Sequence, residues 1–347
     1  MKKIIVAPLN WGLGHATRCI PIIQALLDSG FEPIIASDGA ALELLKKEFP
    51  KVISFELPSY NVAYAQQGKN FKWKMLVQLP KIVNAIKKER AKINKILTAY
   101  QFDGIISDNR LGVYSKNVPS VFITHQLNVL TGRTTWITTK LHEKYIQKFT
   151  ECWVPDVEFG QNLSGKLGHS TALKKNIKYI GPISRLAKKT MPVKYDLMVL
   201  LSGPEPQRTL LEEKIISELE FYTKKVVFIR GVIEKNQTIE QKGLVTFYNY
   251  MNSQELENTF NESNHILCRS GYTTVMDLAK LNKKAFFIPT PGQFEQEYLA
   301  KKFDKEGIIP ACRQEKFKIR KLDKIDFYKG FTNYSKKITW AELFDLF

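Results

Sequence analysis

The sequence has few cysteines, and they are not grouped. The four thiols are far apart on the chain, without a Cys-x-x-Cys pair: Cys19, Cys152, Cys268 and Cys312. Structural zinc sites and disulfide frameworks both need cysteines at short, repeated spacings. We therefore expect neither, and the spacing fits a reducing compartment.

Long hydrophobic runs are also missing. The longest apolar stretches, such as Leu197–Leu201, have the length of a strand, whereas a membrane span needs about 20 apolar residues. The N-terminal stretch ending at Pro8 is too short for the core of a signal peptide. We interpret it as a first strand and expect a cytoplasmic protein.

Acidic residues are scarce relative to basic ones. The chain has 52 Lys and Arg against 34 Asp and Glu, a formal charge of +18. Such a surface suits nucleic acid, an anionic membrane or a phosphorylated substrate, or reflects only the composition of the source genome. The sequence motifs of RRM, KH and helix-turn-helix domains are absent, so we expect no nucleic-acid partner.

The length of 347 residues suits two domains of about 150 residues each. Apolar runs of strand length alternate with amphipathic helical stretches in both halves, which predicts parallel sheets with crossover helices. We expect a first Rossmann-like domain over 1–182, a linker over 183–195, a second domain over 196–330, and a C-terminal helix over 331–347 that returns to the first domain. Ligands of such sheets bind at the carboxyl ends of the strands.

A glycine loop, Gly12-Leu13-Gly14-His15, follows the first predicted strand. Glycines let the backbone approach a ligand, and a helix start presents free N–H groups. His15 can accept a proton near neutral pH, so we predict a general base there. Asp108 ends another buried strand and is the predicted partner of the His15 ring. The alternatives are a capping histidine, a plain phosphate loop and, for Asp108, a turn residue.

The second half contains the most distinctive stretch, Arg269-Ser270-Gly271 followed by Asp277. A strand delivers Ser270 and Gly271 to a helix start, a geometry suited to a diphosphate. Asp277 lies almost two helical turns on and can reach a diol such as that of a ribose. A polar loop after the next strand offers groups for sugar hydroxyls, namely Glu295, Gln296 and Glu297. For any one of these residues, a cap or turn role is the simpler alternative.

The stretch 245–300 resembles the C-terminal domain of the family 28 (MurG-like) glycosyltransferases. The resemblance implies a GT-B fold, in which two Rossmann-like domains face a central cleft. It implies that Ser270 and Gly271 contact the diphosphate, that Asp277 binds ribose, and that Gln296 and Glu297 approach the donor sugar. The Gly14 loop and the Gly181-Pro182 turn also resemble family features.

Two departures separate this sequence from the peptidoglycan enzyme of that family. The phosphate loop of the second domain reads Ser202-Gly203-Pro204-Glu205-Pro206, where the two prolines remove N–H donors. Ser202 and Gly203 can still contact phosphate, and Arg208 can supply charge. The first loop lacks the longer glycine run, so we expect a relative with a different acceptor.

We expect glycosyl transfer from a nucleotide sugar, uridine-linked by resemblance, to an acceptor hydroxyl: a hexosyltransferase that inverts the anomeric carbon. No Asp-x-Asp motif occurs, so we predict neither metal nor cofactor. The helix start at Ser270, the Ser202 loop, Arg269 and Arg18 would stabilise the leaving diphosphate.

The acceptor is left open by the sequence. Residues 69–95 contain nine Lys and Arg and the single acid Glu89, interleaved at the front with aromatic and aliphatic residues. Such a segment predicts peripheral contact with an anionic membrane, and hence a lipid-linked acceptor. A long helix with a solvated basic face is an equal alternative.

Three rival functions share parts of this pattern. An NAD-dependent oxidoreductase would use Gly12, Gly14 and Asp38, but Thr17 replaces the third glycine and the Ser270 signature is unexplained. A nucleotide-sugar 2-epimerase of the same fold, or a non-catalytic nucleotide-sugar-binding protein, would fit the signature as well.

Overall fold

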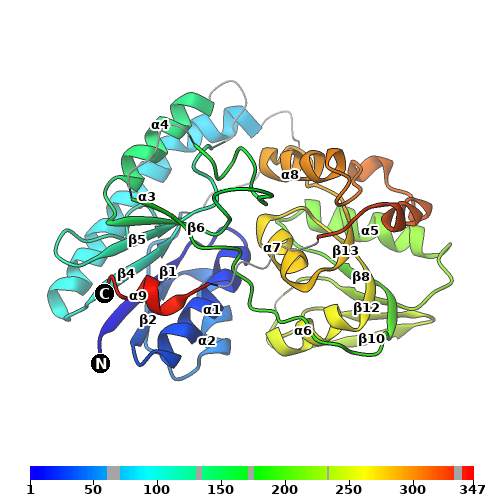
Figure 1. The fold of residues 1–347 in the computed structure, drawn as a ribbon, viewed down its shortest axis with the longest axis horizontal. Coiled ribbons are helices and arrows are strands. Elements are labelled where there is room, and N and C mark those ends of the chain that lie inside the picture. Colours follow the sequence, from blue (N-terminus) through cyan, green and yellow to red (C-terminus); the bar gives the residue numbers. More distant parts are fainter. Residues whose placement is uncertain (61–70, 130–134, 171–175, 233, 332–337) are drawn as a thin grey trace. The chain divides into compact units, whose positions relative to one another are not determined.

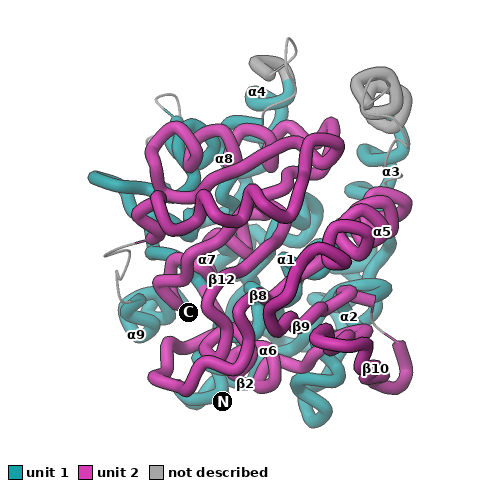
Figure 2. The backbone as a smooth tube through the Cα atoms, turned by 90° about the vertical axis from the view of Figure 1, so that its right-hand side faces the viewer, with its two compact units in different colours: residues 1–65, 70–183, 336–347 teal, residues 66–69, 184–335 magenta. Residues whose placement is uncertain are grey.

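The computed structural model describes residues 1–60, 71–129, 135–170, 176–232, 234–331 and 338–347; for 71–79 and 135–137 it describes the backbone alone (Figure 1). The chain divides into two compact units (Figure 2). Among the described residues, unit 1 comprises those up to Ile183 together with 338–347, and unit 2 those from Ser184 to Phe331. Each unit is built around its own sheet.

The sheet of unit 1 is parallel throughout, with the strand order β3-β2-β1-β4-β5-β6-β7. This is the order of a Rossmann fold, in which the chain winds outward in both directions from β1. The strands are β1 (Lys3–Pro8), β2 (Glu32–Ser37), β3 (Ser54–Glu56), β4 (Gly104–Asp108), β5 (Ser120–Ile123), β6 (Glu151–Val154) and β7 (Ile177–Tyr179).

Helices cover both faces of this sheet, because successive strand side chains point to opposite faces. Ile4 and Val6 pack with α1 and α2, whereas Ile5 and Ala7 pack with α3. The helices are α1 (Gly14–Asp28), α2 (Gly39–Glu48), α3 (Phe71–Ala99) and α4 (Thr135–Ile146). None of the described helices is both long and apolar enough to cross a membrane.

The C-terminal segment returns to unit 1, as predicted. Its helix α9 (Trp340–Phe344) places Leu343, Phe344 and Phe347 in the same core cluster as α1 and α2 (Figure 1). The ring of Phe347 lies against Gly104, where a Cβ atom would come within 2.2 Å of the phenyl ring. The absence of a side chain at Gly104 therefore makes room for the end of the chain.

The sheet of unit 2 has the order β10-β11-β9-β8-β12-β13. Its strands are β8 (Tyr195–Leu200), β9 (Val226–Ile229), β10 (Ile239–Lys242), β11 (Val245–Tyr248), β12 (Ser263–Cys268) and β13 (Lys284–Phe287). The helices are α5 (Gln207–Leu219), α6 (Ser253–Asn261), α7 (Tyr272–Leu281), α8 (Phe294–Lys305), η3 (Gln314–Lys316) and η4 (Ile319–Phe327). The expectation of two parallel-sheet α/β domains is thus confirmed.

One strand departs from the parallel pattern. β10 pairs antiparallel with β11 through a tight turn at Gly243, whose φ of +58° suits glycine. All of its residues are exposed and two are charged, as is common for an edge strand that must not pair with other chains. Three of the four residues of β10 are polar, so the strand lacks a hydrophobic pattern and was not predicted from the sequence.

Both sheets reverse their winding direction at one point. In unit 1 the reversal lies between β1 and β4, and in unit 2 between β8 and β12. Open α/β sheets bind ligands in the crevice at such a switch point. The predicted site residues lie at or after the carboxyl ends of these four strands, except Glu295, Gln296 and Glu297, which lie at the start of α8 after the neighbouring strand β13.

Candidate active site

His15 and Asp108 meet at the switch point of unit 1. Pro8, the last residue of β1, is in register with Asp108, the last residue of β4. The loop after β1 therefore begins beside Asp108, and α1 brings His15 back to it. His15 Nδ1 lies 2.8 Å from Asp108 Oδ1. The His15 side chain is 17% exposed and that of Asp108 is fully buried.

This contact fixes the tautomer of His15. An ionised carboxylate can only accept a hydrogen bond, so Nδ1 must donate its proton to Asp108. Arg18 Nη2 also lies 3.0 Å from Nδ1, but a protonated Nδ1 cannot accept from it. Nε2 is then the nitrogen with a free lone pair, which is the state that a general base requires.

A buried arginine holds the carboxylate in its ionised form. Arg18 is 1% exposed; its Nε donates to Asp108 Oδ2 at 2.7 Å, and its Nη2 donates to Oδ1. Burial alone would raise the pKa of Asp108, but the charge of Arg18, and then His15, outweigh it and hold this pKa well below its usual range. Arg18 is therefore committed to Asp108, which argues against its predicted role at the diphosphate.

The switch point of unit 2 gathers the residues predicted to bind the donor. Leu200 of β8 is in register with Cys268 of β12, so the loop Ser202-Gly203 lies next to Arg269-Ser270-Gly271. Ser202 and Gly203 are exposed, and Gly203 has a φ of +105° that favours glycine. Ser270 is buried and its hydroxyl donates to the Gln296 carbonyl at 2.8 Å.

Three helices start around this point without a side-chain cap from their N-cap residues. These residues are Pro206 for α5, Gly271 for α7 and Gln293 for α8. At α5 the preceding residue supplies a cap, since the Glu205 carboxylate accepts from the Thr209 N–H at 3.2 Å. The N-termini of α7 and α8 carry the positive end of the helix dipole, which favours an anion.

Arg269, which follows β12, forms hydrogen bonds with the loop after β13 and with the start of α5. Its guanidinium donates to the carbonyls of Gln207, Ile288 and Pro289 at 2.7, 3.2 and 3.2 Å. The side chain is 1% exposed, and no described residue forms an ion pair with it. Burial lowers the pKa of Arg269 to about 9, a value at which the group stays charged near neutral pH. A buried, uncompensated cation is costly unless an anion binds close by.

Thr290 belongs to the polar loop that the sequence indicates after β13, but it was not among the predicted binding residues. It is 4% exposed, and its Oγ1 finds no hydrogen-bond partner among the described residues. A Cβ atom on Gly203 would lie 3.8 Å from this oxygen, so the hydroxyl faces the Ser202-Gly203 loop. Buried hydroxyls are almost always paired. Its place in the loop between β13 and α8 was the signal in the sequence.

The three polar residues of the α8 start have different surroundings. Gln296 is buried, and its Oε1 accepts from the Thr290 N–H at 2.9 Å. Glu297 is exposed, and its Oε1 accepts from the Gly292 N–H at 2.9 Å. Glu295 is partly exposed on the same turn. Gln296 and Glu297 thus brace the loop that carries Thr290.

Asp277 is held in unit 2 by the connecting segment. Its Oδ1 accepts from the Ser184 hydroxyl at 2.6 Å. Burial raises the pKa of Asp277 to about 6, although Ser184 and Arg185 act in the opposite direction. The carboxylate that was predicted to bind a ribose therefore titrates close to neutral pH.

Arg208 and Asp38 form ion pairs and hydrogen bonds with other side chains of the protein, which differs from the ligand contacts that the sequence suggested for them. Arg208 donates to Glu205 at 2.6 Å and to Glu212 at 2.7 Å, so two acids neutralise its charge. Asp38, the ribose-binding acid of the oxidoreductase alternative, is an acceptor for Arg110 and Asn10. Gly14 begins α1, and its carbonyl accepts from Thr17.

The basic segment 69–95 lies partly outside the described residues. Residues 69 and 70 are not described, nor are the side chains of 71–79, which include the aromatic and aliphatic group. In the described part of α3, Lys81, Lys87, Lys88, Lys92 and Lys95 are exposed. Arg90 instead packs on the Tyr114 ring at 3.8 Å.

Metal-ligating residues are not grouped in the described chain: no set of three His, Cys, Asp or Glu side chains there is placed to hold an ion.

Part of the second half matches a known protein family. Residues 206–326 match the Glycosyltransferase family 28 C-terminal domain. The chain is 24% identical over 222 residues to a UDP-N-acetylglucosamine--N-acetylmuramyl-(pentapeptide) pyrophosphoryl-undecaprenol N-acetylglucosamine transferase of Buchnera aphidicola, covering 62% of this chain and 58% of that one. It is 21% identical to an uncharacterized glycosyltransferase of Methanosarcina mazei, covering 88% and 84%.

Solved structures show the same fold. The glycotransferase of kitacinnamycin superposes with a TM-score of 0.64 at 13% identity, over 92% of this chain and 88% of that one. MurG of Acinetobacter baumannii superposes with a TM-score of 0.55 at 13% identity, over 94% and 90%. Both are glycosyltransferases of the GT-B fold, which this chain shares.

Proposed function

We propose that this chain, a GT-B protein with a glycosyltransferase family 28 C-terminal domain, transfers a sugar from a nucleotide diphosphate to an acceptor hydroxyl. The family and the relatives support glycosyl transfer. The nucleotide-sugar donor, the inversion of the anomeric carbon and the independence from metal go beyond what the family and the relatives support. The transferase from Buchnera aphidicola is named for a UDP-linked donor, so we propose a UDP-sugar.

The observation that carries the donor half is the buried charge at the switch point of unit 2. Arg269 is enclosed without an acidic partner in the described chain, and the Thr290 hydroxyl is unpaired beside the Ser202-Gly203 loop. A diphosphate placed against the starts of α7 and α8 would satisfy both. Fixed donors that stabilise developing negative charge contribute about 3–4 kcal/mol each in enzymes where they have been removed, so they could do the work of a divalent ion.

The observation that supports the acceptor half is the His15–Asp108–Arg18 arrangement of unit 1. His15 Nε2 would accept the proton of the acceptor hydroxyl, which attacks the anomeric carbon on the face opposite the diphosphate. The proton ends on His15, the nucleoside diphosphate leaves, and the anomeric configuration inverts. Asp108 stabilises the imidazolium that forms and stays ionised.

A panel of nucleotide sugars tested by thermal shift examines the donor half. A ligand at 100 times its Kd stabilises the folded protein by about 2.7 kcal/mol, so a selective UDP-sugar response is expected. A protein that responds to no nucleotide sugar contradicts the proposal. Mass spectrometry of the products without acceptor separates a 2-epimerase, which would interconvert sugars.

We further propose a cytoplasmic protein that contacts an anionic membrane through residues 69–95 and takes a lipid-linked acceptor. The exposed lysines of α3 support this proposal. Flotation with phosphatidylglycerol vesicles tests it: co-flotation that 0.5 M salt reduces is expected, since polybasic attraction is screened by salt. A protein that stays at the bottom of the gradient at low salt contradicts it.

A further inference from the structure

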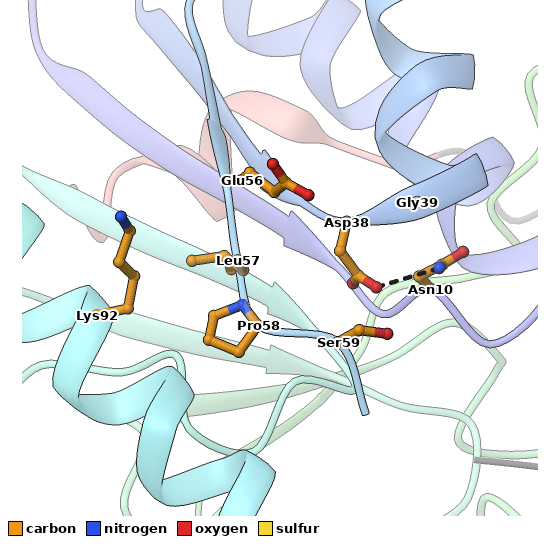
Figure 3. A pocket seen from close by; sticks show the side chains of 8 residues that line it. All are labelled: Asn10, Asp38, Gly39, Glu56, Leu57, Pro58, Ser59 and Lys92. Atoms are coloured by element: carbon orange, nitrogen blue, oxygen red, sulfur yellow. Dashed lines mark hydrogen bonds between the residues drawn. The ribbon is translucent and has the colours of Figure 1, made fainter. Parts of the chain in front are cut away.

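A cavity of about 690 Å³ opens in unit 1 where β1, β2 and β3 end (Figure 3). Pockets of this size hold small molecules. The polar residues that line the cavity are Asn10, Asp38, Glu56, Ser59 and Lys92. We propose that this cavity binds a sugar ring of the acceptor through its hydroxyl groups and excludes phosphate. The inference rests on the proposed transferase function and specifies the substrate class.

A buried ionic network holds one wall of the cavity in place. Arg110 is fully buried; it donates to Asp38 and, at 2.6 Å, to Glu89 of α3. The Tyr60 hydroxyl donates to the other oxygen of Glu89 at 2.8 Å. Because these groups are satisfied by one another, the Asp38 carboxylate keeps one orientation before any ligand arrives. Preorganised groups lose less entropy on binding.

Asn10 joins the other wall to this network. Its Nδ2 donates to Asp38 Oδ2 at 3.1 Å (Figure 3), and its Oδ1 accepts from the Ala41 N–H at 3.3 Å. A Cβ atom on Gly39 would lie 2.4 Å from Asn10 Nδ2, and Gly39 has a φ of +50°. Glycine is therefore required there for the amide to reach the carboxylate.

The charge of the lining argues against an anionic ligand. Lys92 is the one cation among the described residues that line the cavity, against the carboxylates of Asp38 and Glu56. The cation behind the wall, Arg110, is already paired with two acids. A phosphate would face more negative than positive charge, whereas the hydroxyls of a sugar can donate to carboxylates.

The rest of the lining suits a neutral ring with hydroxyl groups. Carboxylate, amide, hydroxyl and ammonium groups offer both acceptors and donors around the rim. Pro58 adds apolar surface beside them (Figure 3), which can contact the C–H face of a pyranose.

The segment that carries the proposed base His15 also contributes Asn10 to the lining of the cavity. Asn10 and His15 are both in the segment between β1 and the first turn of α1. A ring held by Asn10 and its neighbours would be fixed by the same loop that positions His15. The cavity is therefore suited to hold the acceptor sugar whose hydroxyl is to be deprotonated, or the ring next to it.

Ligand-observed saturation-transfer NMR on the full chain tests the inference. The probes are the methyl glycosides of glucose, galactose and N-acetylglucosamine, with inorganic pyrophosphate as the competing anion. We expect saturation transfer to at least one glycoside and no displacement by pyrophosphate. Ser59→Trp, a substitution at an exposed lining position, should abolish the signal. Glu56→Gln should weaken binding by about tenfold, the loss expected when a hydrogen bond to a charged group is removed.

Glu43→Gln is the matched control, since Glu43 is exposed on α2 outside the lining, and it should leave the signal unchanged. No signal from any glycoside, a signal that survives Ser59→Trp, or displacement by pyrophosphate would each overturn the inference. Binding of the UDP-sugar is measured on the same samples. If the nucleotide sugar binds and the glycosides do not, this inference alone fails; if no nucleotide sugar binds, the proposed function fails.

Discussion

Asp108 and Arg110 carry opposite charges, lie two residues apart at the exit of β4, and belong to two different ionic networks. Asp108 accepts from Arg18 and holds His15, whereas Arg110 donates to Asp38 and Glu89. Asn109 between them has a φ of +59°, a conformation that asparagine tolerates better than most residues. One short turn thus fixes both the proposed base and the wall of the cavity.

Replacing His15 by glutamine should separate catalysis from donor binding. Loss of a general base lowers the rate by about 10²–10⁴-fold, while the Kd of the nucleotide sugar should stay the same because the donor residues lie in unit 2. Turnover with the acceptor and donor titration by calorimetry measure the two effects. His265→Ala removes a partly exposed imidazole from β12 and should leave both unchanged. A His15 variant with undiminished turnover would exclude the base assignment.

Replacing Asp108 by asparagine should destabilise the protein and alter its acid response. Removing one partner of a buried ion pair costs about 3–5 kcal/mol, because Arg18 would lose its carboxylate. The folded-state pKa of Asp108 lies below the unfolded value of about 3.9, so its contribution is present above that pH and is lost as the pH falls further.

Urea unfolding between pH 3 and pH 7 measures both effects. Asp108→Asn should lower the free energy of unfolding at pH 7 and reduce its fall in acid. Asp103→Asn, at an exposed aspartate just before the same strand, is the control and should retain the wild-type acid slope. Equal slopes in Asp108→Asn and wild type would show that Asp108 is not held ionised.

The fold was largely predictable because its signals are local. Strand-length apolar runs and glycine-marked helix starts indicated both sheets, and the return of the C-terminal segment was expected together with the GT-B resemblance. Adjacent strand ends also placed His15 near Asp108. Partners of charged side chains were not predictable, because they depend on contacts between distant segments. Arg18 and Arg208 both looked available for a diphosphate, yet each is paired with acids. No sequence motif predicts the cavity beside Asp38, because its lining comes from separate segments of the chain.

Donor affinity should depend on pH through Asp277. An ionised carboxylate accepts the ribose hydroxyls, and its pKa in the free protein is about 6 because of burial. A raised pKa favours the protonated form, so affinity for an intact nucleotide sugar should level off above pH 6 and fall by up to about tenfold per pH unit below it. The intact sugar is used because its diphosphate has no group that titrates in this range.

Calorimetry between pH 5 and pH 8 tests this dependence. Asp277→Asn should bind more weakly at pH 8 and lose the pH dependence. Ser184→Ala removes the neighbouring hydroxyl but keeps the carboxylate, so the dependence should remain. A flat profile in the wild-type protein would remove Asp277 from the ribose site.

Arg269 should contribute to affinity for phosphate and not for the nucleoside. Arg269→Met removes the buried charge, so the Kd of UDP should rise by at least about tenfold, or 1.4 kcal/mol, while that of uridine changes little. Arg269→Lys keeps a charge but cannot reach three carbonyls, and should show an intermediate loss for UDP. Equal losses for UDP and uridine would indicate a purely structural role. Calorimetry with both ligands decides between these results.

The fit of Phe347 against Gly104 can be tested by a double-mutant cycle. Phe347 is 9% exposed and its ring packs 6.4 Å from that of Trp153, so Phe347→Ala should cost about 3 kcal/mol. In Gly104→Ala the new methyl group would overlap the Phe347 ring. Gly104→Ala should therefore also lower the free energy of unfolding, and its cost should nearly vanish when Phe347 is already alanine. Urea unfolding of the four proteins gives the coupling energy. Additive costs would mean that the C-terminal ring does not occupy the space left by Gly104.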